Sequence, residues 1–213
     1  MGRVAEESPE FGFLNKINRW KKHMELIIAI VGYFLGSLLP AEWMFHLYKH
    51  TSAAELGVKP GTFAVLKSIG ILPGIFCLIF DLGKGFLPPW LAINVFHVNW
   101  NWLPLIALSP VLGHNWPFLR WNKGGWGLAA TGGSLVGLGG WLSFVGLLGL
   151  PFGLIFKKKP GVAIAAVSFP AVLAMLILFH LPWQVLVSAL SLMLLEVFRR
   201  LTGEKKPKEP TGN

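Results

Sequence analysis

The sequence predicts an all-α protein, a polytopic membrane bundle of about seven transmembrane helices, some of them short or broken. Hydrophobic residues make up 54% of the 213 positions and charged residues only 14%, and the mean hydropathy is +0.58. So few polar residues cannot cover the surface of a soluble globule, and long apolar runs are typical of helices that cross a bilayer.

Seven apolar segments follow one another along the chain. They cover residues 25–47, 71–98, 103–114, 128–138, 141–156, 161–179 and 183–198. The first is long and has no small-residue cleavage site, so we expect a retained anchor and not a signal peptide. The segments 103–114 and 128–138 would rise only about 18 Å as helices, against a hydrocarbon core of about 30 Å. We therefore expect the stretch between them to be drawn into a recess that opens to the cytoplasm.

Positive charge alternates along the connections. Those near 97–102, 138–140 and 179–182 carry none, whereas the others are basic, as in the lysine triplet 157–159. The positive-inside bias places the basic connections and the C-terminus in the cytoplasm. Seven crossings put the N-terminus outside, where its basic residues break the rule. Either the segment FGFLNKINRWKKH at 11–23 lies as an interfacial helix, or one crossing is wrongly assigned; because three loops agree, we keep seven crossings.

The domain organisation follows from these segments. We expect a polar or amphipathic N-terminal segment at 1–23, a transmembrane domain at 24–203 and a disordered basic tail at 204–213. The net charge of +9 suggests anionic headgroups or phosphorylated substrates as partners, and no motif for nucleic acid is present. Cys77 is the single cysteine, which excludes an intrachain disulfide. The ten tryptophans are read as a membrane-interface belt.

Two polar features are expected on the cytoplasmic side before residue 100. The first is Ser37, with Glu42 and His46 after it, and the second is the stretch DLGKG at 81–85. Asp81 and Lys84 share a helix face and can pair, either as a structural ion pair or in contact with substrate. Ser37 either donates to a phosphate or is satisfied by its own backbone.

The third polar feature is GHNWPFLRWNKGGWG at 113–127. Its glycines let backbone N–H groups converge where the next helix begins, which is an anion-binding geometry. Arg120 and Lys123 add positive charge, and His114 with Asn115 can supply a base and an oriented donor. The alternative is a hairpin turn in which the two cations only set the topology. Because three features converge, a phosphate site is favoured.

Taken in order, YFLGSLLP, ELGVKPGTFAVLKSIG, DLGKG and LGHNWPFLRWNKGGWGLAATGG resemble the acyl-phosphate-dependent glycerol-3-phosphate acyltransferases of bacterial membranes. The resemblance covers residues 30–203. It implies a seven-crossing enzyme of the cytoplasmic (inner) membrane, with a cytoplasmic active site. Such an enzyme transfers a fatty acyl group from acyl phosphate to glycerol 3-phosphate, or a related phospho-alcohol, in phospholipid synthesis. Acyl phosphate is an activated anhydride, so no acyl-enzyme, metal or cofactor is expected, and membrane lipids are the other partners.

The motifs imply catalytic roles for Ser37, Lys84 and His114. Ser37, Lys84 and Lys123 are expected to hold phosphate, the glycines to present backbone donors, and His114 to act as general base or as an orienting group. Nine further residues are expected to bind substrate. Arg120 is included for its charge and the others for their place in the motifs. They are Asp81, Gly113, Asn115, Arg120, Lys123, Gly124, Gly125, Gly127 and Thr131.

The chain also departs from the family pattern. Trp126 stands where the family has a lysine, VKPGTFA replaces two asparagine-containing motifs, and Leu194 and Val197 occupy a histidine and an asparagine position. Lys59 and Lys123 are candidates for replacing the lost charge. These departures leave open an alternative, a catalytically degenerate paralogue that binds lipid. A transporter is disfavoured because no paired discontinuous segments appear in corresponding halves.

Overall fold

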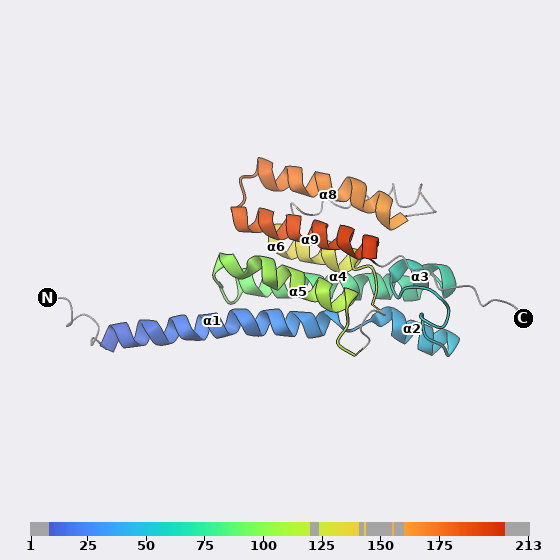
Figure 1. The fold of residues 1–213 in the computed structure, drawn as a ribbon, viewed down its shortest axis with the longest axis horizontal. Helices are drawn as coiled ribbons and strands as arrows, with labels where there is room; N and C mark the ends of the chain where they lie inside the picture. Colours follow the sequence, from blue (N-terminus) through green and yellow to red (C-terminus); the bar gives the residue numbers. More distant parts are fainter. Residues whose placement is uncertain (1–8, 120–123, 141–142, 144–154, 156–159, 203–213) are drawn as a thin grey trace, which may run out of the picture.

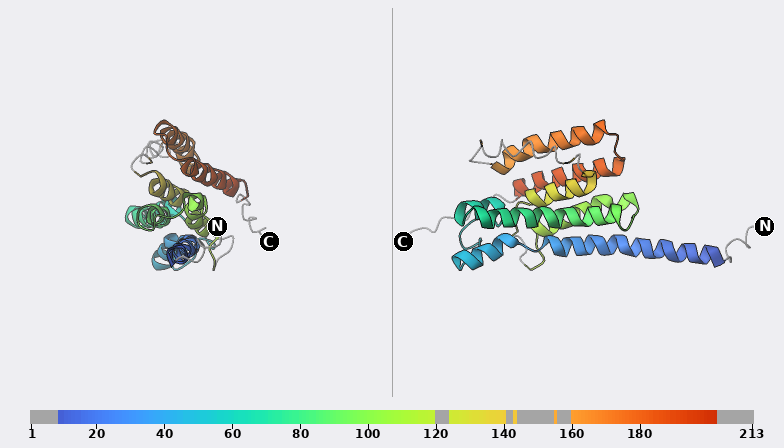
Figure 2. Two further views of the ribbon diagram at one scale, coloured as in Figure 1. Left: turned by 90° about the vertical axis from the view of Figure 1, so that its left-hand side faces the viewer. Right: turned by 180° about the vertical axis from the view of Figure 1, so that it is seen from behind.

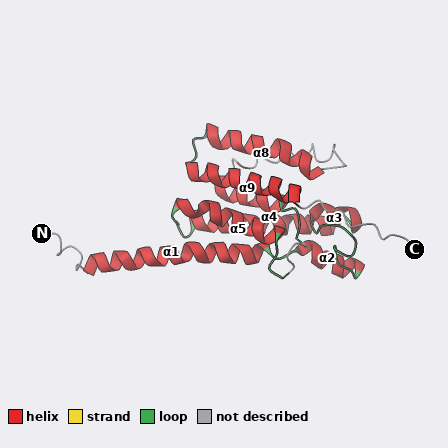
Figure 3. Ribbon diagram, in the orientation of Figure 1, coloured by secondary structure: helices red, strands yellow, loops and turns green. Residues whose placement is uncertain are grey.

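The computed structural model describes residues 9–119, 124–140, 143, 155 and 160–202, and these residues form an all-helical bundle (Figures 1 and 3). The all-α prediction is confirmed. In chain order the helices are α1 (Pro9–Gly36), α2 (Pro40–Lys49), α3 (Thr62–Ser68), α4 (Ile71–Asn94), the 3₁₀ turn η1 (Trp100–Trp102), α5 (Leu103–Asn115), α6 (Leu128–Gly139), α8 (Pro160–Leu178) and α9 (Trp183–Thr202). Most of the expected segment 141–156 lies outside the described residues.

The long helices lie side by side with their axes nearly parallel (Figures 1 and 2). α4 packs against α6, α1 and α5, α9 packs against α5 and α6, and α8 lies at the edge, on α9. The connections after α1, α2 and α5 gather at one end of the bundle with the C-terminal end of α9, whereas the connections after α4 and α8 lie at the other end (Figure 1). Of the described basic residues that flank the connections, those of α2, of α3 and of the last turn of α9 therefore lie at one end, as the charge pattern predicts.

The expected first segment, 25–47, is not one helix. α1 ends at Gly36 and α2 begins at Pro40, and Leu39 before the proline is extended, with φ −111° and ψ 90°. The proline ring disfavours helical backbone at the preceding residue but suits the first turn of a helix. The break frees the carbonyl of Leu38, which accepts a hydrogen bond from Lys84 Nζ at 2.6 Å. The expectation of one continuous segment through 25–47 was wrong. The break between α1 and α2 provides the carbonyl that Lys84 contacts.

Glycines bring the helices together backbone to backbone. A Cβ on Gly133 of α6 would overlap the carbonyl of Leu82 on α4, and a Cβ on Gly113 of α5 would overlap the carbonyl of Tyr33 on α1. Small residues at such crossings are typical of helix pairs in membranes, where close packing replaces the hydrophobic effect as the driving force. Ser134 Oγ, 3.1 Å from the carbonyl oxygen of Gly85, further joins α6 to α4.

The outer faces of the bundle are apolar. Val31 on α1, Ile79 on α4 and Leu194 on α9 are 56%, 65% and 69% exposed, although burying such side chains is favourable in water. By length and composition, His23–Lys49 and Ile71–Asn94 are long and apolar enough to cross a membrane. These outer faces are suited to contact hydrocarbon.

Candidate active site

A buried cluster joins α4 to the end of α5. Asp81 and Lys84 are one helical turn apart, their side chains are 2% and 1% exposed, and Lys84 Nζ lies 2.8 Å from Asp81 Oδ1. His114 Nδ1 lies 3.4 Å from the same carboxylate oxygen. The predicted pairing of Asp81 with Lys84 is confirmed. Because the carboxylate faces both the ammonium and the imidazole, it fixes the orientation of each.

The glycine loop, residues 124–127 before α6, folds over His114. Gly125 N–H donates to the carbonyl of His114 at 3.1 Å, and a Cβ on Gly125 would overlap His114 Nε2. The two ring nitrogens therefore face different groups, Nδ1 the Asp81 carboxylate and Nε2 the loop. Gly125 N–H is already bonded, so it is not one of the free donors that the sequence suggested. The N–H groups of Gly124 and Gly127 have no acceptor among the described residues.

Asn115 is buried beside Gly127. Its side chain is fully buried, and neither Oδ1 nor Nδ2 has a hydrogen-bond partner among the described residues. Gly127 has φ +84°, and a Cβ there would lie 2.5 Å from Asn115 Oδ1 and 3.1 Å from Glu196 Oε1. A left-handed backbone favours glycine, and the missing side chain of Gly127 leaves room for the Asn115 amide and the Glu196 carboxylate beside it. Burying an amide without a hydrogen-bond partner is costly, so a ligand that bonds to the Asn115 amide would remove this cost.

Ser37 lies at the same end of the bundle. Its hydroxyl donates to the carbonyl of Tyr33 at 2.9 Å and accepts from the N–H of Phe118 at 3.3 Å. Of the two readings of this serine, a hydroxyl satisfied by the backbone is the one present in the structure. Ser37 precedes Leu38, whose carbonyl binds Lys84, so the serine and the buried cluster are neighbours.

The last helix contributes residues that the sequence analysis did not place in the site. Thr131 Oγ1 donates to Glu196 Oε1 at 3.0 Å, and Glu196 Oε2 lies 3.6 Å from an Arg200 nitrogen. Arg199 donates to the carbonyls of Gly125 at 3.4 Å and Gly124 at 3.3 Å. A single glutamate within the apolar run LLEVF was the available signal, because a carboxylate inside a membrane helix needs a partner.

Two cations surround the indole of Trp126. Lys59 Nζ lies 4.2 Å from the ring centroid, and the Arg200 guanidinium carbon lies 5.6 Å from it. Partial burial, and then the charge of Arg199, lower the pKa of Lys59 to about 8. The expected ligands Arg120 and Lys123 lie outside the described residues.

Glu42 and His46, the other polar residues of the first feature, lie on α2. The Glu42 carboxylate accepts a hydrogen bond from the N–H of Ala53 at 3.3 Å and lies 3.9 Å from His46, and the bond to Ala53 anchors α2 to the following loop. Within the described ranges, no group of three His, Cys, Asp or Glu residues is placed to hold a metal ion.

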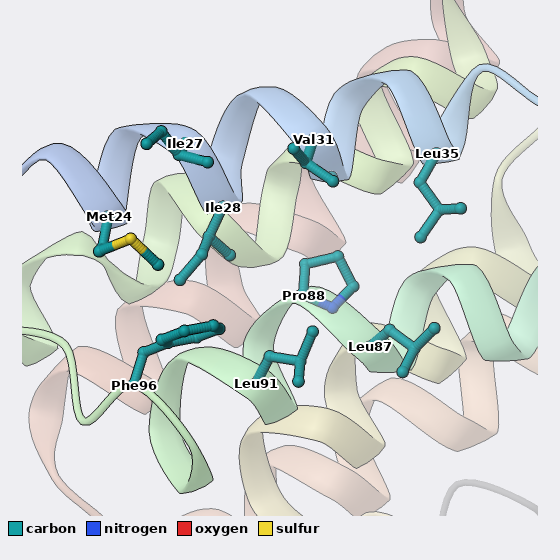
Figure 4. A pocket seen from close by; sticks show the side chains of 10 residues that line it. Met24, Ile27, Ile28, Val31, Leu35, Leu87, Pro88, Leu91 and Phe96 are labelled. Atoms are coloured by element: carbon teal, nitrogen blue, oxygen red, sulfur yellow. The ribbon is translucent and has the colours of Figure 1, made fainter.

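An apolar cavity of about 240 Å³ lies between α1 and α4 (Figure 4). It begins beside Leu35 and Leu87, which are close in sequence to Ser37 and Lys84, and reaches Met24 and Phe96 (Figure 4). The other lining residues are Ile27, Ile28, Val31, Gly32, Pro88 and Leu91. The cavity thus extends from the polar end of α1 toward the opposite end of the bundle.

Comparison with known proteins gives consistent matches. The family model described as glycerol-3-phosphate acyltransferase matches residues 26–202. The chain is similar to the glycerol-3-phosphate acyltransferase of Shouchella clausii, with 31% identity over 82% of this chain and 87% of the relative. It is 34% identical to that of Blochmanniella floridana over 53% of this chain and 57% of the relative.

Solved structures agree with these matches. The chain is similar to PlsY, an integral membrane glycerol 3-phosphate acyltransferase, in its lysophosphatidic acid form. That likeness has a TM-score of 0.71 and 25% identity over 83% of this chain and 88% of the other. The glycerol 3-phosphate form matches in fold with a TM-score of 0.70 and 24% identity, over 84% of this chain and 88% of the other.

Proposed function

The chain belongs to the glycerol-3-phosphate acyltransferase family and is an integral membrane protein, and we propose that the buried Lys84–Asp81–His114 cluster is its catalytic centre. The reaction is transfer of a fatty acyl group from acyl phosphate to the 1-hydroxyl of glycerol 3-phosphate, in phospholipid synthesis. The observation that carries the proposal is the contact of His114 with Asp81 on one side and with the glycine loop on the other. This arrangement fixes Nδ1 against the carboxylate and leaves Nε2 facing Gly125, where the acceptor hydroxyl is proposed to reach it.

His114 acts as the general base. Its Nε2 accepts the proton of the acceptor hydroxyl while the hydroxyl oxygen attacks the carbonyl carbon of the acyl phosphate. The bond between the acyl carbon and the phosphate oxygen then breaks, the proton passes to the departing phosphate, and an ester and inorganic phosphate result. Asp81 stabilises the protonated imidazole and holds the ring in place, as carboxylates do in other base-orienting pairs. Because the donor is already activated, no covalent acyl-enzyme is needed.

The polar groups around the cluster serve the two phosphates. Lys84 supplies positive charge, and the N–H groups of Gly124 and Gly127 supply donors without an acceptor among the described residues. The amide of Asn115, buried and unpartnered in this part of the chain, adds a donor and an acceptor. Charge neutralisation by preformed donors in a buried site is a large part of the stabilisation that such transfers require. Gly113 and Thr131 place these groups by packing and by the bond to Glu196.

The cavity between α1 and α4 provides a place for the acyl chain of the donor. Its lining is apolar, and it includes Leu35, close to the end of α1 at Gly36 (Figure 4). An acyl chain there keeps its methylene groups away from water while its phosphate reaches the cluster, which a two-substrate reaction at a membrane surface requires. The supporting features are the apolar lining of the cavity and the place of Leu35 and Leu87 in it, two and three residues from Ser37 and Lys84 in sequence.

The orientation in the membrane is part of the same proposal. The basic connections lie at the end of the bundle that holds the cluster, so this end and the C-terminus face the cytoplasm, in the inner membrane of a bacterium. Residues 24–203 form the catalytic domain, with 1–23 and 204–213 as flanking segments.

The test uses the purified full chain with acyl phosphate and glycerol 3-phosphate, and it follows both phosphate release and lysophosphatidate. His114→Ala should lower turnover at least about a hundredfold, as expected for loss of a general base. His46→Ala, which changes an exposed histidine at the same end of the bundle, should leave it within about twofold. Turnover by the parent no higher than the uncatalysed background would remove the enzyme proposal.

A second candidate function rests on Trp126. An indole cannot replace the charge of the lysine in the family pattern, so a catalytically degenerate paralogue would keep the fold and bind phospholipid without turnover. Lipid that co-purifies with an inactive parent protein would favour this candidate.

A further inference from the structure

Positive charge accumulates around the indole of Trp126. Lys59 lies over the ring at 4.2 Å and Arg200 at 5.6 Å, while Arg199 binds the carbonyls of Gly124 and Gly125. Among the described residues, the carboxylate in contact with this group is that of Glu196, which is 3.6 Å from Arg200. Three cations thus share one carboxylate, and Lys59 carries a charge that no carboxylate of the described chain pairs with.

The geometry explains why Lys59 stays there. An aromatic face attracts a cation within about 6 Å of its centroid, so Trp126 fixes the ammonium next to the glycine loop. The backbone reinforces the position, because a Cβ on Gly125 would overlap the carbonyl of Pro60. Partial burial and Arg199 lower the pKa of Lys59 to about 8, so the site holds the charged form at a cost that an anion would relieve.

Two buried polar groups, one beside Gly127 and one on α3, also lack hydrogen-bond partners among the described residues. The amide of Asn115, fully buried, lies beside Gly127, which adjoins Trp126. Thr62 Oγ1, three residues after Lys59, is a buried atom without a hydrogen-bond partner among the described residues. An ammonium, an amide and a hydroxyl are together suited to bind the oxygens of a phosphate.

We propose that Lys59, held on the face of Trp126, binds the phosphate group of a substrate beside the glycine loop. This inference rests on the proposed function, because it assigns the cation to one of two phosphorylated substrates, the acyl phosphate donor or the glycerol 3-phosphate acceptor. Their shared chemistry is a phosphate with at least one negative charge. The loop between α2 and α3 thereby provides a charge that position 126 of this chain does not.

The first experiment compares Lys59→Gln with Lys67→Gln. Both remove one lysine charge from the same part of the chain, but Lys67 is exposed on α3. KM is measured separately for donor and acceptor, with kcat. Lys59→Gln should raise KM for one substrate about tenfold or more, as expected for a lost charge-assisted contact, with a smaller change in kcat. The substrate affected identifies the phosphate that is bound. Lys67→Gln should match the parent.

A relocation of charge makes the test sharper. The ring of Trp126 is 4.2 Å from Lys59 Nζ, so a lysine at position 126 can bring an ammonium to nearly the same place. Lys59→Gln combined with Trp126→Lys should therefore restore KM most of the way to the parental value. If Lys59→Gln has parental KM values for both substrates, the inference is wrong while the proposed function stands.

A binding measurement separates the two failures. If the parent shows no turnover, the proposed function fails, and the full chain is then treated with an amine-reactive reagent near pH 8, with and without glycerol 3-phosphate or inorganic phosphate. Protection of Lys59 by either anion, read by mass spectrometry, would support the phosphate site without catalysis. Equal labelling of Lys59 with and without the anions would overturn it.

Discussion

Replacement of Asp81 by Asn tests the buried cluster most directly, because it removes the counterion of Lys84 and changes little else in shape. Lys84 is 1% exposed, with Nζ 2.8 Å from Asp81 and 2.6 Å from the carbonyl of Leu38. In Asp81→Asn the ammonium keeps one carbonyl and an amide oxygen but loses its negative partner. Breaking a buried ion pair in this way costs about 3–5 kcal/mol.

The asparagine can still accept a hydrogen bond, so we expect the lower value, about 3 kcal/mol. For a chain of 213 residues, this corresponds to a fall in Tm of roughly 6–12 °C. Asp81→Asn combined with Lys84→Met removes both charges and should recover much of the loss, because an apolar pair of similar volume is often as stable as a buried ion pair.

Cys77 provides the assay. It is the single cysteine, fully buried, and lies one turn before Asp81 on α4. Cys77 packs against Phe45 of α2 and Val65 of α3. Heating the purified full chain with a thiol-reactive fluorogenic reagent therefore reports the loss of this packing on α4. A Tm for Asp81→Asn within about 2 °C of the parent, or a double variant no more stable than the single one, would refute the assignment of Lys84 as a buried, charged partner.

Three further predictions concern packing, pH and the acyl chain. Gly133→Val should destabilise the bundle by about 1–3 kcal/mol or more, because its side chain overlaps the Leu82 carbonyl, and the same thiol assay would show an unchanged Tm if α4 and α6 were not in close contact. Because the pKa of Lys59 is lowered to about 8, the rate at which its amine is labelled should rise through a midpoint near pH 8. The free energy of unfolding should rise with pH between about 8 and 10.5, because the unfolded chain binds more protons there. A labelling midpoint near 10.5 would contradict the burial of Lys59. Leu91→Trp, which fills the cavity between α1 and α4, should lower turnover of long-chain acyl phosphates relative to short ones in a competition assay, and an unchanged ratio would place the chain elsewhere.

Local signals were enough for the helices and for one ion pair. Hydropathy is a property of short segments, so α4, α5, α6, α8 and α9 begin and end within a few residues of the expected bounds. The spacing of Asp81 and Lys84 fixed their shared face. The break between α1 and α2 was missed, although Pro40 lies within the apolar run and prolines at such positions end one helix and begin another.

Contacts between distant segments could not be read in this way. Arg199 reaches Gly124 and Gly125 across 74–75 residues of sequence, and this contact depends on how α9 packs against α5 and α6. As part of a basic C-terminus, the arginine was read only as a marker of topology. Ser37 shows a different difficulty. A serine near a helix end can bond to its own helix backbone or to a ligand, and the sequence does not distinguish the two. In the structure its hydroxyl donates to the Tyr33 carbonyl.

The guanidinium of Arg199, which supports the glycine loop, belongs to a helix that is synthesised after every other part of the cluster. A nascent chain that has reached residue 182 already contains Asp81, Lys84 and His114, but it lacks the arginine that binds the Gly124 and Gly125 carbonyls. The loop acquires this support only when α9 packs into the bundle, so we expect partly inserted chains not to consume acyl phosphate.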